Sequence, residues 1–228
     1  MILIAMKKGD TIYMGTDTRI IVGDSKRNEI SECNCKIQKL ENGMLLGVTG
    51  ERIEKQTLIA YSEIFTLDKK GQLTRRHIIK EIIPKLMEML AEEELLVEKE
   101  GEMPYMKADI CLAYKDVLYE ISPGFAVFKY EDYQVVGRES NYAQATIMNT
   151  KDSDDINERI IKALDITSVN SYHVGRPYVL IDTKNLEYKF VKTTKKIFRL
   201  RQSRYLLNAL SQILVSYVIE IEISKCKT

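Results

Sequence analysis

The chain has 228 residues, of which 45% are hydrophobic, and its 34 basic residues nearly balance 33 acidic ones to give a formal net charge of +1. This composition suits one globular domain with a sizeable core, and the balanced charge predicts no nucleic-acid partner. We expect a cytoplasmic protein without metal or cofactor, because there is no secretory signal, no apolar run of the ~20 residues that a membrane span needs, and no zinc spacing among the four cysteines.

The chain opens with two short apolar runs, residues 1–6 and 11–17, which predict two strands. The intervening residues 7–10 predict a hairpin turn, in which Gly9 would take a positive φ.

The middle of the chain predicts a long helix and then a β-rich segment. From Thr74 onward, apolar residues recur at helical spacing as far as Leu90, and Pro84 within them predicts a kink or a break. The strands expected after this helix are residues 108–114, 117–121 and 125–128.

Two helices and two strands are expected next. The helices cover about 139–150 and 153–168, and the second opens after acidic residues that favour a helix N-terminus. Strands 178–182 and 186–190 would pair across 183–185. The order of strands, two helices, strands, two helices and strands favours an α+β fold with two packed sheets, each covered by helices on its outer face.

A C-terminal extension, residues 192–228, follows the domain predicted over residues 1–191. It begins with a basic segment at 195–201 and continues with apolar residues at helical spacing over 205–223, which predicts an amphipathic helix. We expect this helix to contact a neighbouring subunit. The alternatives are packing on its own domain and, less favoured, a membrane surface.

Several segments resemble the proteasome β-subunit and HslV peptidase family. Asp17 stands sixteen positions after Met1, as an aspartate does after the family's N-terminal threonine. The segment 35–40 resembles the one that carries the family's catalytic lysine, a role that falls to Lys36. The segment 45–50 resembles the strand end that lends an oxyanion amide, assigned to Gly47, and the resemblance implies a helix over about 51–65 after it. Residues 137–145 resemble the Gly-Ser-Gly-Gly-Asn-Tyr-Ala segment of HslV.

The resemblance covers about residues 1 to 191 and has consequences for fold and assembly. It implies a four-layer αββα sandwich of two antiparallel sheets between helices. It also implies a homo-oligomer, such as a ring, and an ATPase as a further partner.

The chemistry that the resemblance implies needs an N-terminal hydroxyl or thiol whose own amine removes its proton. Met1 supplies an amine but no such nucleophile, and Ile2 has no hydroxyl. Arg138 stands where the family has a serine, and Ser171 and Val174 stand at the positions of its second aspartate and that aspartate's serine partner. The sequence therefore predicts a non-catalytic subunit that acts in assembly or binding.

One alternative is an active N-terminal-nucleophile peptidase or amidohydrolase whose processed or different N-terminus exposes Thr, Ser or Cys. Its substrate would be peptides or unfolded protein. Asp17 and Lys36 would be catalytic in that protein, whereas in a non-catalytic subunit they would form a structural ion pair. His77 and His173 are expected to be surface or capping residues, and Cys33 and Cys35 to be ordinary thiols rather than a redox pair.

Overall fold

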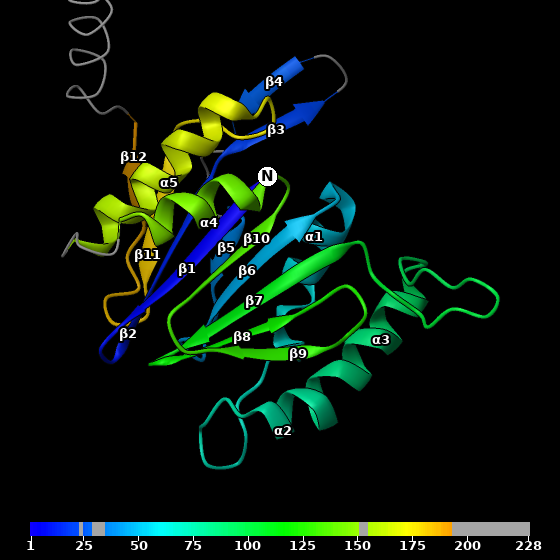
Figure 1. Cartoon of the computed structure of the whole chain (residues 1–228). Coiled ribbons are helices and arrows are strands. Elements are labelled where there is room, and N and C mark those ends of the chain that lie inside the picture. Colours follow the sequence, from blue (N-terminus) through cyan, green and yellow to red (C-terminus); the bar gives the residue numbers. More distant parts are fainter. Residues whose placement is uncertain (23–24, 29–34, 151–154, 193–228) are drawn as a thin grey trace, which may run out of the picture. The chain divides into compact units, whose positions relative to one another are not determined.

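The computed structural model describes residues 1–22, 25–28, 35–150 and 155–192 (Figure 1). The chain divides into two compact units, Met1–Val191 and Lys192–Thr228. The helix predicted over 205–223 lies outside the described residues, as does Cys33. Among the described residues, no helix combines the length and apolar character needed to cross a bilayer.

Strands supply both the beginning and the end of the first unit. The strands are β1 (Ile2–Lys8), β2 (Thr11–Asp17), β3 (Arg19–Val22), β4 (Ser25–Asn28), β5 (Ile37–Lys39), β6 (Leu45–Gly50), β7 (Ala108–Tyr114), β8 (Val117–Ile121), β9 (Val127–Tyr130), β10 (Tyr133–Gly137), β11 (Tyr178–Asp182) and β12 (Lys189–Val191). The helices are α1 (Arg52–Ala60), η2 (Ser62–Ile64), α2 (Arg75–His77), the π-helix η3 (Ile78–Ile82), α3 (Ile83–Glu92), α4 (Ser140–Met148) and α5 (Ile156–Asn170).

The strands form two five-stranded sheets and one two-stranded sheet. The first large sheet has the order β10-β1-β2-β11-β12, the second has the order β5-β6-β7-β8-β9, and β3 pairs with β4. Neighbouring strands are antiparallel throughout. The mixed α/β architecture with antiparallel sheets therefore agrees with the sequence prediction.

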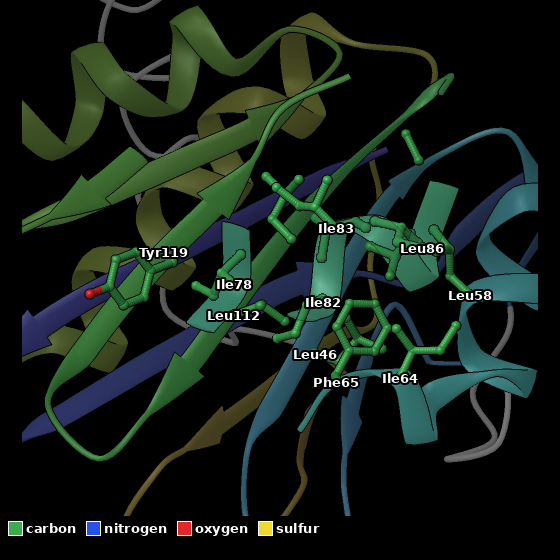
Figure 2. Packing of buried hydrophobic residues seen from close by; sticks show 14 of the residues in the cluster. Leu46, Leu58, Ile64, Phe65, Ile78, Ile82, Ile83, Leu86, Leu112 and Tyr119 are labelled. Carbon is green, nitrogen blue, oxygen red and sulfur yellow. The ribbon is translucent and has the colours of Figure 1, made fainter. Parts of the chain in front are cut away.

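Three apolar clusters hold these elements together, and the alternation of strand side chains explains them. In β1, Ile2, Ile4 and Met6 pack with α4 and α5, whereas Leu3 and Ala5 face the second sheet. A third cluster joins the other face of the second sheet to α1, η2, η3 and α3. Figure 2 shows the labelled members of this third cluster, which are Leu46, Leu58, Ile64, Phe65, Ile78, Ile82, Ile83, Leu86, Leu112 and Tyr119.

Local sequence signals placed several boundaries correctly. Gly9 has a φ of +62° between β1 and β2, and the Thr74 side chain accepts a hydrogen bond from the His77 amide at the start of α2. Pro84 is the second residue of α3, and the backbone is helical at Ile82 and Ile83, where the π-helix passes into the α-helix. The helix predicted from Thr74 therefore continues through Pro84 to Glu92 without the predicted break, and only the type of helix changes.

Other boundaries were wrong. The helix expected over 51–65 is divided at Tyr61 into α1 and η2. The strands expected from 125 and 186 begin at Val127 and Lys189, because Phe125 and Leu186 have positive φ angles that a strand does not accept. The pairing of β11 with β12 is nevertheless antiparallel, as expected. Strands β3, β4 and β10 were not predicted.

Candidate active site

Asp17 and Lys36 meet in the interior. Asp17 ends β2, and Lys36 directly precedes β5, so the two residues come from different sheets. Lys36 Nζ donates a 2.7 Å hydrogen bond to Asp17 Oδ1, and the two side chains are 3% and 0% exposed. Burial lowers the pKa of Lys36, and the adjacent Asp17 carboxylate opposes that shift.

Asp17 also fixes the start of β1 and the start of β3. Its Oδ1 accepts from the Ile2 amide at 3.1 Å, and its Oδ2 accepts from the Arg19 amide at 3.1 Å. Lys36 Nζ makes a second hydrogen bond, of 3.2 Å, to the Arg19 carbonyl. These bonds satisfy the buried charges and hold Met1 beside the ion pair.

Met1 is held between two segments from later in the chain. Its α-amine donates to the His173 carbonyl at 3.4 Å, and its carbonyl accepts from the Arg138 amide at 3.0 Å. Burial is the main cause that lowers the pKa of this amine from 8.0 to about 6, with Asp17 raising it and Lys36 lowering it further. An amine with this pKa is largely neutral at pH 7 and could accept a proton.

A cavity of about 580 Å³ opens beside Met1; we call it the Met1 cavity. Its described lining comes from β3, the end of β6 and the start of α1, the start of β7, and two loops. The lining residues are Met1, Arg19, Ile20, Ile21, Thr49, Gly50, Glu51, Arg52, Lys107, Asp109, Gly137, Arg138 and His173.

Two glycines that line the Met1 cavity have backbone conformations that other residues rarely adopt. Gly50 has a φ of +142°, and a Cβ there would lie 2.5 Å from the Lys107 carbonyl oxygen. Gly137 has a φ of +103°, and a Cβ there would lie 2.5 Å from the Met1 carbonyl oxygen. Only glycine permits these close approaches of main chain to main chain.

Gly47, the predicted oxyanion donor, is not among the residues that line the Met1 cavity. It is within β6, paired with Ile37 and Cys111, and a Cβ there would collide with the side chains of Leu3 and Met14. Its place in the structure is therefore between the two sheets. Gly50, three residues later, is the glycine of this strand that lines the Met1 cavity.

A polar network beside Met1 was missed by the sequence analysis. Ser171 Oγ donates to Glu139 Oε2 at 2.8 Å and accepts from the His173 amide at 3.0 Å. Arg138 Nη1 lies 3.0 Å from His173 Nε2, which must accept because a guanidinium has no acceptor. His173, expected to be a surface or capping residue, is partly exposed and lines the cavity. Val174 contributes its carbonyl, which accepts from Arg19 Nη1 at 2.7 Å.

The part of the lining that comes from β6 and β7 carries a hydroxyl and a carboxyl group. Thr49 Oγ1 donates to Asp109 Oδ2 at 3.2 Å, and burial raises the pKa of Asp109. An aspartate in the otherwise apolar strand 108–114 was the sequence signal for this group. Among the described residues, no group of three or more His, Cys, Asp or Glu could hold a metal ion.

No protein-family model and no curated protein matches the sequence. Solved structures do match. Thiobacillus denitrificans BPH is 18% identical with a TM-score of 0.65, and the match covers 82% of this chain and 99% of that one. HslV from Trypanosoma brucei is 16% identical with a TM-score of 0.55, covering 80% of this chain and 98% of that one.

Anbu, described as an ancestral beta-subunit, matches over more of this sequence. The Anbu of Hyphomicrobium sp. strain MC1 is 14% identical with a TM-score of 0.64, and the match covers 94% of this chain and 97% of that one. At such low identities the similarity speaks for the fold alone. The chain has the fold of HslV and Anbu, which is the proteasome β-subunit-like fold of N-terminal nucleophile hydrolases that its sequence resembles.

Proposed function

We propose that this chain is a non-catalytic subunit of the proteasome, HslV and Anbu type that binds extended peptide segments in the Met1 cavity and acts within an assembly. The observation that carries this proposal is the intact Asp17–Lys36 pair beside a residue that has neither hydroxyl nor thiol. A thioether has no proton to give up to the amine and cannot become an acylated intermediate. The charged pair is thus present in a chain whose first residue offers no nucleophile.

A structural role explains why the pair would persist without catalysis. Removing one member would leave an uncompensated buried charge, which costs about 3–5 kcal/mol. Asp17 also satisfies the amides of Ile2 and Arg19, so its loss would leave further groups unpaired. The pair therefore stabilises the fold whether or not it takes part in a reaction.

Peptide binding is supported by one edge of β3, which no described strand covers. Ile20 and Ile21 of β3 line the Met1 cavity, and among the described residues β3 pairs with β4 on one side only. An extended peptide can add a strand to such an edge through main-chain hydrogen bonds. The cavity of about 580 Å³ would then receive a side chain of that peptide.

The proposed assembly rests on two observations. The Anbu complex of Pseudomonas aeruginosa, described as a helical assembly, matches 95% of this chain with a TM-score of 0.60. Large apolar side chains on α4 and α5 are also exposed, which are Tyr142, Met148, Ile166 and Val169. Exposed apolar groups of this kind suit contacts between subunits. An ATPase partner stays a prediction from the resemblance.

The proposed architecture is the four-layer αββα sandwich. Its support is the set of three apolar clusters, one between the two large sheets and one between each sheet and its helices. That arrangement would place the Asp17–Lys36 pair at one end of the contact between sheets.

One observation favours the alternative of an active hydrolase. The Met1 amine has a pKa of about 6 and lies beside the ion pair, so a hydroxyl or thiol at this position would find a ready base. Gly50, rather than Gly47, would then be the candidate oxyanion donor, because it lines the cavity. The alternative needs a different residue at position 1.

A covalent labelling experiment separates the two proposals. The purified chain is incubated with a fluorogenic peptide and with epoxomicin, which Thiobacillus denitrificans BPH binds in its complex structure. We expect no turnover and no added mass. The Met1→Thr variant with a free N-terminal amine is the matched positive test of the scaffold, and adding Lys36→Met to it should abolish any activity that it gains.

Turnover by the unaltered chain that disappears in Asp17→Asn would replace the non-catalytic proposal with the active one. Native mass spectrometry of the same sample measures the subunit count. A monomer at micromolar concentration would contradict the proposed assembly role.

A further inference from the structure

Among the described residues that line the Met1 cavity, cationic side chains outnumber carboxylates. Its described lining includes four cationic side chains, Arg19, Arg52, Lys107 and Arg138, and two carboxylates, Glu51 and Asp109. Lys107 and Glu51 offset each other at 3.6 Å. Two further cations of the lining, Arg19 and Arg138, contact the 172–174 segment, which also accepts a hydrogen bond from the Met1 amine.

Arg19 is fixed in place by neutral groups. Its Nη1 donates to the carbonyls of Val174 at 2.7 Å and Tyr172 at 3.3 Å. Its guanidinium lies so close to Gly175 that a Cβ there would collide with it. Within the described part of the chain, no carboxylate pairs with this guanidinium, so the structure positions a cation without neutralising it.

Arg138 presents a second such cation. Its Nη1 donates to His173 Nε2 at 3.0 Å, and the side chain is otherwise exposed. The neighbouring Glu139 carboxylate is occupied by the hydroxyl of Ser171, and no described carboxylate pairs with Arg138. Because Arg19 and Arg138 bind adjacent residues of the 172–174 segment, both guanidiniums stand on one side of the cavity.

We propose that the Met1 cavity selects acidic peptides, with a glutamate or aspartate side chain bound by Arg19 and Arg138. This inference rests on the proposed peptide-binding function and names its substrate class. Guanidinium groups bind carboxylates through strong charge-assisted hydrogen bonds, and several of their N–H groups are uncommitted here. Asp109, which also lines the cavity, would repel an anion placed beside it.

Fluorescence anisotropy with two labelled peptides tests this selectivity. The peptides are identical except that one carries glutamates at its centre and the other glutamines, and both are measured at the same ionic strength. We expect the glutamate peptide to bind the unaltered protein about tenfold more tightly, as one charge-assisted contact provides. Arg138→Gln should remove most of that preference, and Arg138→Lys should keep part of it.

Arg76→Gln is the matched control. It removes the same charge from an exposed position on α2, outside the Met1 cavity, and should leave the preference unchanged. Thermal unfolding of each variant verifies that it is folded. Arg138 is exposed, so we expect its replacement to be tolerated.

The remaining outcomes separate the two levels of the proposal. Equal binding of both peptides, unchanged by Arg138→Gln, would overturn the acidic selectivity and leave peptide binding standing. Binding of neither peptide would overturn the proposed peptide-binding function and this inference with it. Displacement of the glutamate peptide by millimolar inorganic phosphate, at the same ionic strength as a chloride control, would show a general anion site and overturn the assignment to peptide carboxylates.

Discussion

The ammonium of Lys36 and the carboxylate of Asp17 form a buried ion pair of 2.7 Å that connects the two large sheets. Asp17 comes from the end of β2 in one sheet, and Lys36 precedes β5 at the edge of the other. The same carboxylate holds the Ile2 amide, so the pair also sets the position of Met1. One interaction thus supports both the fold and the candidate site.

Lys36→Met should lower the free energy of unfolding by about 3–5 kcal/mol, because it leaves the Asp17 carboxylate buried without its cation. Urea denaturation monitored by circular dichroism measures the change. Lys39→Met is the control, since Lys39 is exposed on β5, the strand that follows Lys36, and its loss should change stability little.

Combining Lys36→Met with Asp17→Asn tests the coupling. If the ion pair is the interaction that is lost, the double variant should be destabilised by less than the sum of the two single changes. Additive effects would show that the two side chains act independently.

Gly137→Ala should destabilise the fold more than Gly9→Ala. Both glycines have positive φ angles, so both substitutions carry a backbone cost of about 1 kcal/mol or more. Only at Gly137 would the new Cβ meet a neighbour, the Met1 carbonyl oxygen at 2.5 Å, whereas nothing lies within 4 Å at Gly9. Thermal unfolding midpoints compare the two, and equal shifts would contradict the steric argument.

Glu120 should make stability depend on pH. Burial is the main cause that raises the pKa of this carboxyl group from 4.5, and Asp109 raises it further, although Tyr130 and Gln134 donate hydrogen bonds to it. A raised folded-state pKa means that the stabilising contribution is complete below pH 4.5 and is lost as the pH rises through the folded-state value.

Glu120→Gln removes this titration while its amide oxygen can still accept both hydrogen bonds. We therefore expect the stability of the variant relative to the unaltered protein to increase from pH 4.5 towards neutrality, measured by urea denaturation at each pH. Glu131→Gln is the control, because Lys129 lowers the pKa of Glu131 and the dependence should have the opposite sign. A pH-independent difference for Glu120→Gln would contradict the prediction.

Ser171→Ala should destabilise the loop that lines the Met1 cavity. The hydroxyl donates to the Glu139 carboxylate and accepts from the His173 amide, so its loss leaves two polar groups without this partner and should cost about 1–3 kcal/mol. Urea denaturation gives the value. Glu139→Gln should reduce the free energy of unfolding by less in the Ser171→Ala variant than in the unaltered protein. Fully additive effects would argue against the hydrogen bond between Ser171 and Glu139.

Sequence patterns were sufficient wherever the structure depends on neighbours along the chain. The continuous apolar run of residues 1–6 gave β1 its two apolar faces, and Thr74 marked a helix start through its own hydrogen-bonding capacity. The spacing between Met1 and Asp17 also placed the two residues correctly, because β1, a tight turn and β2 form a local hairpin that returns the chain to its start.

Tertiary structure decided the features that depend on distant segments. Gly47 and Gly50 look alike in sequence, but the packing of Leu3 and Met14 puts one between the sheets and leaves the other at the cavity. The network of Glu139, Ser171 and His173 beside Met1 had no local sequence signal, because its partners are distant in the chain. Ser171 is 32 residues from Glu139, and His173 is 172 residues from Met1. Local periodicity determines which face of a strand is apolar, whereas only the packed sheets determine which polar groups share a cavity.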